Sequence, residues 1–319
     1  MNLQPLLKRI GRGASGARSL ERHEAAQLFS WLFDGLLDPA QVGAVLIALR
    51  MKGESVDELV GALDALQGRQ GRIGVEPGRP VVSIPTYNGA RNAPNLVPLL
   101  ACLLAREGVQ VIVHGVRHDP GRTASAEIWS ALGQQLCESI GQAEASLQRG
   151  APAFVPIDIL APPLARMLGF RTLLGLRNTG HTIAKLLNPT ALPACLRLSA
   201  YTHPEFDLLQ RQTLERLDAH AMVMRATEGE VVANVRRPSK IDWFSEGRWQ
   251  TAVEGQSVAT GGESIWPERD ARSTAAWTAA VLAGVNSVPD SIAAQVEAVA
   301  KAARASMSIP SGASAIWRE

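Results

Sequence analysis

The sequence predicts an α/β protein in which a small all-helical N-terminal domain precedes a large α/β domain with a mainly parallel central sheet. Residues 1–70 show helical periodicity and no strand-like alternation. From Pro80 onward a strand, a loop, a helix and a second strand follow one another, and such a βαβ unit requires parallel strands. The chain has 319 residues, 46% of them hydrophobic, which is enough for one large or two ordinary domains. We expect a helical domain over 1–75 and an α/β domain over 76–319.

Three helices are expected in the N-terminal domain. In the segment 20–33 the large apolar residues recur four positions apart, with Ser19 as the predicted N-cap. Asp38 followed by Pro39 opens the next helix, which Gly53 ends. Ser55 with Glu58 forms a capping box for a helix over 56–67.

The remaining chain alternates between strand and helix patterns. The Leu-rich segment 159–187 is helical without a strand, and we expect it to leave the α/β domain and pack on the N-terminal helices. Expected strands are 80–85, 109–115, 196–200, 221–226 and 230–235, and expected helices are 96–108, 123–132, 205–217, 271–284 and 290–306.

Composition excludes several classes of protein. Cys102, Cys137 and Cys195 lie far apart without CxxC spacing, which argues against a zinc site or a disulfide framework. No apolar run approaches the ~20 residues of a membrane span, so no membrane partner is expected. The first residues contain no apolar signal region, and we therefore expect a cytoplasmic protein.

The formal net charge of +2 conceals an uneven distribution. Residues 71–200 carry 12 basic and 7 acidic side chains, whereas residues 201–319 carry 12 basic and 15 acidic ones. Only five of the 32 basic residues are lysine. This bias has two explanations, the codon usage of a GC-rich genome or a need for phosphate contacts, since the guanidinium fork binds two oxygens at once. The first 18 residues contain no acid and four cations: Lys8, Arg9, Arg12 and Arg18.

Two loops at one edge of the sheet are candidates for a phosphate or ligand crevice. A loop between a strand and a helix N-terminus offers N–H groups and the positive end of the helix dipole. The alternatives are an ordinary βα loop with Asn as turn former and a His with a structural role at the end of a buried strand. The candidate crevice residues are Thr86, Asn88, Gly89, Arg91, Asn95, His114, Arg117, Arg122 and Ser125.

Two further segments carry charged patterns. Arg177, His181 and Lys185 are spaced four residues apart, so a helix aligns them as a basic stripe; a solvated helix face explains the spacing equally well. Glu228 and Glu230 flank a glycine and are candidates for Mg²⁺ ligands or for a hairpin, of which we favour the hairpin. The sequence contains no Ser–His–Asp order, HExxH motif or P-loop.

Taken together, these pieces resemble the anthranilate phosphoribosyltransferase fold, which is shared with a class of nucleoside phosphorylases. The resemblance covers nearly the whole chain. It implies that the small helical domain is joined by hinges to the α/β domain and is the place of dimerisation. The segments that carry it are GAVLIALRMKGE (43–54), VIVHG (111–115), SAEIWSALG (125–133) and LGFRT (168–172).

The departures from that family are informative. The family's Gly-Thr-Gly-Gly-Asp loop is replaced by 86–90, TYNGA, and its Lys-His-Gly-Asn-Arg by 113–117, VHGVR. The arginine that contacts anthranilate falls on Ala165, and the Mg²⁺-binding Asp-Glu pair falls on Val231 and Val232. Without that pair, pyrophosphate departure lacks its charge neutralisation. The resemblance therefore implies no efficient anthranilate transfer, no required cofactor and no Mg²⁺, and leaves only residual binding of phosphate, sulfate or phosphoribosyl pyrophosphate.

One branch of the family shares these departures, and the sequence resembles that YbiB-type branch in IPTYNGARNAPNLVPLL (84–100), RNTGHTIAKL (177–186) and LRLSAYTHPE (196–205). The resemblance implies a homodimer that binds DNA or RNA without sequence preference through a basic groove. Trp31 or Tyr87 are candidates for base stacking, although a core position is preferred for Trp31. The alternative is a phosphoribosyl or glycosyl transferase with an unidentified acceptor. The expected nucleic-acid contacts are Lys8, Arg9, Arg12, Arg18, Arg50, Lys52, Arg91, Arg177 and Lys185.

Overall fold

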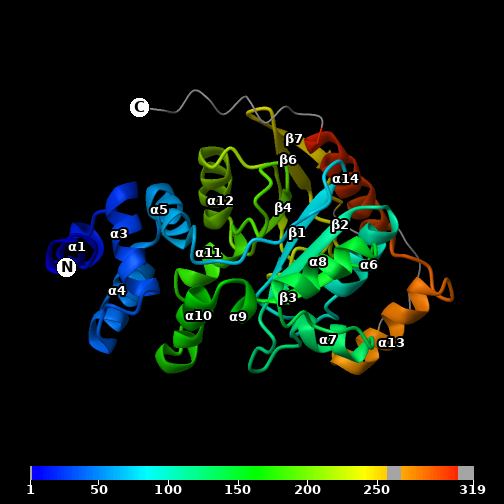
Figure 1. The fold of residues 1–319 in the computed structure, drawn as a ribbon, viewed down its shortest axis with the longest axis horizontal. Helices are drawn as coiled ribbons and strands as arrows, with labels where there is room; N and C mark the ends of the chain where they lie inside the picture. The colour runs from blue at the N-terminus through cyan, green and yellow to red at the C-terminus, as the bar shows by residue number, and fades with distance from the viewer. Residues whose placement is uncertain (1, 257–266, 308–319) are drawn as a thin grey trace.

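A computed structural model describes residues 2–256 and 267–307 of the chain. Its N-terminal part is a group of helices at one end of the molecule (Figure 1). The helices α3 and α5 pack against each other, and α1 and α2 pack against α4. The bounds are α1 Gln4–Ile10, α2 Gly13–Gly16, α3 Arg22–Phe33, α4 Pro39–Lys52 and α5 Val56–Leu66.

The helix termini follow local sequence signals, with one exception. Asp38 accepts the N–H of Gln41 at 2.9 Å, and Gly53, at φ 80°, ends α4. Ser55 caps α5 together with Glu58, so both of these predictions are confirmed. The prediction of Ser19 as the cap of α3 is wrong, because Glu21 takes that position and its N–H is bonded by the Glu24 carboxylate.

The central sheet has seven strands in the order β3-β2-β1-β4-β5-β6-β7. The first five are parallel, and β6 and β7 are added antiparallel at one edge. The predicted fold class is therefore confirmed. The strands are β1 Val81–Thr86, β2 Gln110–Gly115, β3 Ala153–Pro156, β4 Leu196–Tyr201, β5 Ala221–Arg225, β6 Ile241–Ser245 and β7 Arg248–Val253.

The order of the strands creates a switch point between β1 and β4. The chain winds from β1 through β2 to β3 in one direction and then continues from β4 to β5 in the other. The register joins β1 to β4 only at Val82 with Leu196 and Ser83 with Arg197. The loops after these two strands leave the sheet on opposite sides of this point. Ligands of open α/β sheets bind in the crevice that such a reversal opens.

Helices cover both faces of the sheet. One apolar cluster lies between the sheet and α6, α13 and α14, and the other joins the opposite face to α10–α12 and the N-terminal helices. α10 and α11 lie between the helical domain and the sheet and pack against α3 and α5 (Figure 1). The bounds are α6 Val97–Arg106, α7 Ser125–Ala131, α8 Ile140–Gln148, α9 Ile157–Leu160, α10 Pro162–Leu174, α11 Gly180–Lys185, α12 Glu205–Arg216, α13 Ala271–Leu282 and α14 Asp290–Ser306.

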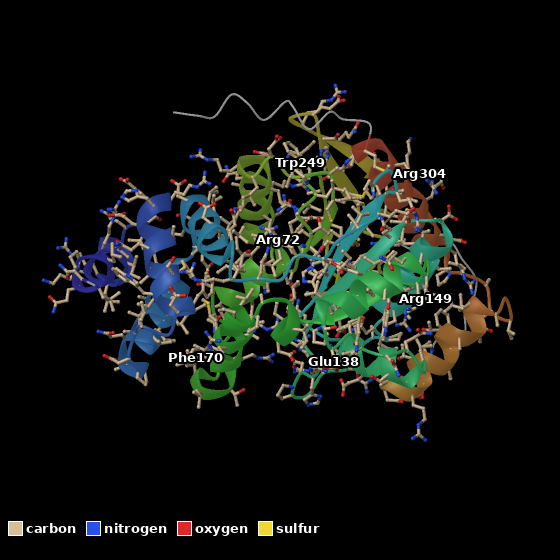
Figure 2. All side chains as sticks on the ribbon, in the orientation of Figure 1. Arg72, Glu138, Arg149, Phe170, Trp249 and Arg304 are labelled. Carbon is tan, nitrogen blue, oxygen red and sulfur yellow. The ribbon has the colours of Figure 1, made fainter. Side chains whose placement is uncertain are left out.

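The chain passes between the helical and α/β parts after α5, again between β3 and α10, and a third time between α11 and β4, and the first and third of these segments are neighbours. Arg72, labelled in Figure 2, lies in the first segment and donates to the carbonyl of Thr190 in the third at 2.7 Å. Ile73 forms a parallel β-bridge with Thr190. Among the described residues, no helix combines the length and the apolar character that a membrane span requires.

The strand predicted over 230–235 is wrong. Gln295 of α14 holds this segment instead, because its side chain accepts the N–H of Ala233 at 2.7 Å and donates to the carbonyl of Val231 at 2.9 Å. The apolar side chains that suggested a strand are buried in the core under α14. The strands β3, β6 and β7 were not predicted.

Candidate functional site

A pocket of about 440 Å³ lies at the switch point. Residues that follow β1 and β4 line it, and α11 and α4 complete its wall. It holds four cationic side chains and one carboxylate: Arg50, Arg122, Arg177, Lys185 and Glu228. The pocket is also lined by Asn88, His181, Tyr201, His203 and Phe206.

Two glutamates fill the loop after β1. Glu230 Oε1 accepts the N–H of Asn88 at 2.9 Å and that of Gly89 at 2.6 Å. Glu228 accepts the N–H groups of Arg91 and Asn92, the latter at 2.9 Å. Successive main-chain N–H groups of this kind form an anion-binding concavity. The chain's own carboxylates occupy the place where a phosphate binds in related loops.

The turn that carries the two glutamates is pressed against the loop. Asn88 donates to the carbonyl of Gly229 at 2.6 Å, and Arg122 donates to the carbonyls of Gly89 and Glu228 at 3.3 Å. Gly229 has φ 98°, and a Cβ there would overlap the side chain of Asn88. Thr227 and Glu230 exchange two backbone hydrogen bonds. The favoured hairpin interpretation is therefore right about the turn and wrong about the strand after it.

These residues do not fit a magnesium ion bound as in the phosphoribosyltransferases. The carboxylates of Glu228 and Glu230 are directed to main-chain N–H groups, and the pKa of Glu230 is raised by burial. Val231 and Val232 are buried in the apolar core. Within 2–256 and 267–307, no three His, Cys, Asp or Glu side chains are grouped as metal ligands. We derive no chemical step through such an ion.

Three of the predicted crevice residues lie beneath the loop rather than in the pocket. The hydroxyls of Thr86 and Ser125 are 2.6 Å apart, and Asn95 donates to Ser125 Oγ at 3.0 Å. All three side chains are buried. Asn95 also donates to the carbonyl of Thr123 at 3.3 Å and accepts the N–H of Val97 at 3.2 Å, so these side chains support the loop from within the chain.

Two other predicted crevice residues point away from the pocket. His114 is fully buried between Ser83 and Tyr87, at 3.0 and 2.6 Å, and burial lowers its pKa to about 3. Arg117 is bound by Glu138 and Asp158. Glu138 is labelled in Figure 2 at the lower edge of the α/β domain. His114 therefore has a structural role at the end of a buried strand, which was the alternative to a ligand contact.

The basic stripe predicted over 177–185 is not a single helix face. α11 begins only at Gly180, so Arg177 lies in the loop before it, where it donates to Asn88 Oδ1. The fold nevertheless brings Arg177, His181 and Lys185 to the same pocket. Burial lowers the pKa of Lys185 to about 8 and, with its arginine neighbours, that of Arg177 to about 10.

The N-terminal cations form a second site on the helical domain. Lys8, Arg9, Arg12 and Arg18 line one hollow of about 290 Å³. Arg9 is paired with Glu24 at 2.7 Å, whereas Lys8, Arg12 and Arg18 are exposed and form no ion pair with a described residue.

The remaining predicted contacts differ in their environment. Arg50 and Arg91 are exposed. Lys52 forms a buried ion pair with Glu58 at 2.7 Å, so its ammonium group is not free for a phosphate. Tyr87 is 2% exposed and bonded to His114, which excludes it from stacking on a base, and Trp31 packs against the core.

Sequence reasoning missed one side of the pocket. Tyr201, the last residue of β4, lines the pocket together with His203 and Phe206, which follow the strand. Their signal was present in the order strand, aromatic, turn and helix over 196–216.

Comparisons with known proteins agree with this architecture. The helical bundle domain of the glycosyl transferase family matches residues 4–69. The uncharacterized protein YbiB of Escherichia coli (strain K12) is 37% identical over 297 residues, 93% of this chain and 92% of YbiB. An anthranilate phosphoribosyltransferase of Methylocella silvestris is 31% identical over 224 residues, 70% of this chain and 59% of that enzyme.

Solved structures show the same fold at low sequence identity. The anthranilate phosphoribosyltransferase from Thermus thermophilus has a TM-score of 0.71 at 21% identity, covering 94% of this chain and 96% of that one. The enzyme from Saccharomyces cerevisiae with 4-fluoroanthranilate has a TM-score of 0.68 at 12% identity, covering 96% of this chain and 95% of that one. The chain therefore belongs to the family of YbiB, whose members are homologues of the anthranilate phosphoribosyltransferases and share their fold.

Proposed function

We propose that this protein binds DNA or RNA without sequence preference, as a homodimer built on a phosphoribosyltransferase scaffold. The observation that carries the proposal is a contrast between two sites. The loop that would hold a diphosphate is filled by Glu228 and Glu230. The cations Lys8, Arg12 and Arg18, in contrast, are exposed and form no ion pair with a described residue. Exposed cations of this kind bind the phosphate backbone whatever the base sequence.

An apolar groove supports the dimer. It measures about 700 Å³ and runs between α1, α2 and α4, lined by Leu7, Ile10, Ile47 and Met51. Met51 is 77% exposed, and contiguous exposed apolar surface is typical of an interface. Lys8 borders both this groove and the basic hollow. A second copy seated on the groove by a two-fold axis would place the two basic hollows beside one interface and double the cationic surface.

Fluorescence anisotropy with labelled oligonucleotides of unrelated sequence tests the proposal. We expect similar affinities for all sequences and a steep loss of affinity with salt, because counterions are released from the phosphates. The variant K8E/R12E should lower both the affinity and the salt slope. Arg149→Glu is the matched control, since Arg149 is exposed on the α/β domain, at the far side from the helical domain (Figure 2). Affinity that does not change with salt contradicts the proposal.

A second candidate is a phosphoribosyl or glycosyl transferase with an unidentified acceptor. It is favoured by the cationic pocket at the switch point and by the named activity of the relatives. Calorimetry with phosphoribosyl pyrophosphate separates the two functions. Binding that requires Mg²⁺ favours the transferase, whereas no Mg²⁺-dependent heat is expected of the nucleic-acid-binding protein.

A further inference from the structure

The pocket at the switch point contains positive charge that the described part of the chain neutralises only in part. Among the described residues, the hydrogen-bond partners of Lys185 Nζ are the carbonyl oxygens of Gly229 at 3.4 Å and of Ala200 at 3.5 Å. Arg177 Nη2 has no hydrogen-bond partner among the described residues, and its nearest carboxylate, Asp119, is 3.9 Å away. Arg50 is exposed at the rim and forms no ion pair with a described residue.

The acidic groups around this pocket each have another partner, and only Glu230 Oε2 and Asp119 Oδ1 among their buried oxygens accept no hydrogen bond from a described residue. Glu228 and Glu230 accept main-chain N–H groups of the loop after β1, and Asp119 is bound by Arg171. His181 is uncharged at neutral pH, because burial lowers its pKa to about 3. A desolvated cation without a partner costs free energy, and an anion supplied from outside removes that cost.

Aromatic side chains line the same pocket. Tyr201 ends β4 and Phe206 lies in the first turn of α12, and both are half-buried at the pocket. Gln210 and Thr202 add hydrogen-bonding groups beside them. Nucleobases stack on aromatic side chains at about 1–3 kcal/mol per base and without much sequence preference. The pocket therefore combines cations that can bind a phosphate with aromatic side chains on which a base can stack.

From this juxtaposition we propose that the pocket binds a single nucleotide unit. Its phosphate lies against Arg177, Lys185 and Arg122, and its base lies against Tyr201 and Phe206. The inference rests on the proposed function and names one ligand site within it. The volume of about 440 Å³ falls in the range of small-molecule sites. The ligand is a monophosphate rather than a diphosphate, because the loop N–H groups that would take a second phosphate are filled.

Two sources share this ligand chemistry, the 5′-phosphorylated end of a nucleic-acid strand and a free nucleoside monophosphate. Arg50 connects the pocket to the helical domain, because it lies on α4, the helix that also borders the apolar groove. A strand bound along the helical domain can therefore place its end in the pocket.

Calorimetry on the full chain tests the pocket with adenosine 5′-monophosphate, adenosine and inorganic phosphate. We expect the monophosphate to bind more tightly than either part. R177Q and K185Q should each weaken it by about tenfold, as expected for a lost charge-assisted hydrogen bond. F206A should weaken the binding of the monophosphate but not that of inorganic phosphate. Because Phe206 is only half-buried, this variant remains informative if R177Q fails to fold. Arg149→Glu should have no effect.

Competition with 5′-phosphorylated and 5′-hydroxyl oligonucleotides identifies the source. Displacement of the monophosphate only by the phosphorylated strand assigns the site to strand ends, and no displacement by either assigns it to the free nucleotide. The inference is overturned if adenosine 5′-monophosphate does not bind, or if F206A leaves its affinity unchanged. Either result leaves salt-dependent oligonucleotide binding intact. Loss of oligonucleotide binding with retained monophosphate binding would instead overturn the proposed function alone.

Discussion

Glu230 Oε1 lies 2.6 Å from the main-chain nitrogen of Gly89, although 141 positions separate the two residues. This contact places a carboxylate where a βα loop ordinarily holds a phosphate. Glu228 repeats it one step along the loop, at the N–H groups of Arg91 and Asn92. The two carboxylates together satisfy a diphosphate-like set of donors from within the chain. The loop therefore has anion-binding geometry but no vacant donors at these four positions.

Removing the two carboxylates should uncover an anion site. In E228A/E230A the buried N–H groups of Asn88 and Gly89 lose their acceptor, which costs about 1–3 kcal/mol of stability per unsatisfied group. Inorganic pyrophosphate should restore that loss, because a ligand that binds only the folded state stabilises it. Thermal unfolding with and without pyrophosphate measures the effect.

The matched control for this variant is E144A. Glu144 also accepts a main-chain N–H, that of Gly74 at 2.8 Å, but it stands alone, away from the loop after β1. Its loss should lower the melting temperature without recovery by pyrophosphate. Equal recovery of both variants, or recovery of neither, would contradict a filled anion site.

Gly229→Ala should be among the most damaging single substitutions in the α/β domain. Gly229 has φ 98° and its added Cβ would overlap the Asn88 side chain, so the turn must move off the loop. Strain and overpacking together predict a loss of about 2–4 kcal/mol. Gly78→Ala is the control: Gly78 has φ 80° but open space around it, and about 1 kcal/mol is expected. Chemical denaturation measures both, and equal losses would refute the close approach.

Local sequence signals predicted much of the fold, and contacts distant in sequence account for the errors. The caps at Asp38 and Ser55 depend on residues three positions away, so the sequence contains all that is needed to find them. The strand predicted over 230–235 is absent because this segment is held by Gln295, which lies more than sixty positions further along the chain. The roles of Glu228 and Glu230 depend on a loop about 140 positions earlier. Periodicity and composition contain no information on such pairings, so the filled loop could only be found in the structure.

The buried ion pair between Lys52 and Glu58 should contribute strongly to the helical domain. Glu58 is fully buried and also accepts the N–H groups of Leu20 and Ser55, at 2.9 and 2.8 Å. E58A leaves a buried ammonium and two N–H groups without their acceptor, and about 3–5 kcal/mol of stability should be lost. E76A is the control, since the Glu76–Arg79 pair is exposed and within one turn. Its loss should be under about 1 kcal/mol in the same denaturation experiment.

Stability should depend on Lys185 at alkaline pH. Burial lowers its pKa from 10.5 to about 8, against the attraction of Glu230 and with a contribution from Arg177. Between about pH 8 and pH 10 the unfolded chain therefore binds more protons than the folded one, and the free energy of unfolding attributable to Lys185 rises with pH. Below pH 8 the lysine is protonated in both states, so it does not make the free energy of unfolding depend on pH.

The difference in unfolding free energy between the wild type and K185Q isolates this effect. The other charged and titratable groups at the pocket, Arg50, Arg122, His181, His203 and Glu228, are present in both proteins. Arg177, whose pKa is lowered to about 10, sets the upper limit of the useful range. A difference that is constant from about pH 8 to pH 10 would show that Lys185 keeps an ordinary pKa.

Met51→Glu should separate the proposed dimer and reduce nucleic-acid binding with it. Met51 is 77% exposed beside the apolar groove of α1 and α4, and a carboxylate buried in an interface there has no partner. Because a monomer presents only one basic hollow, the salt slope of binding should fall to about half. Leu173→Glu is the control, since Leu173 is 80% exposed on α10, outside the groove. Analytical ultracentrifugation and anisotropy follow the two effects. A variant that sediments like the wild type contradicts the interface, and a monomer with an unchanged salt slope contradicts the doubled basic surface.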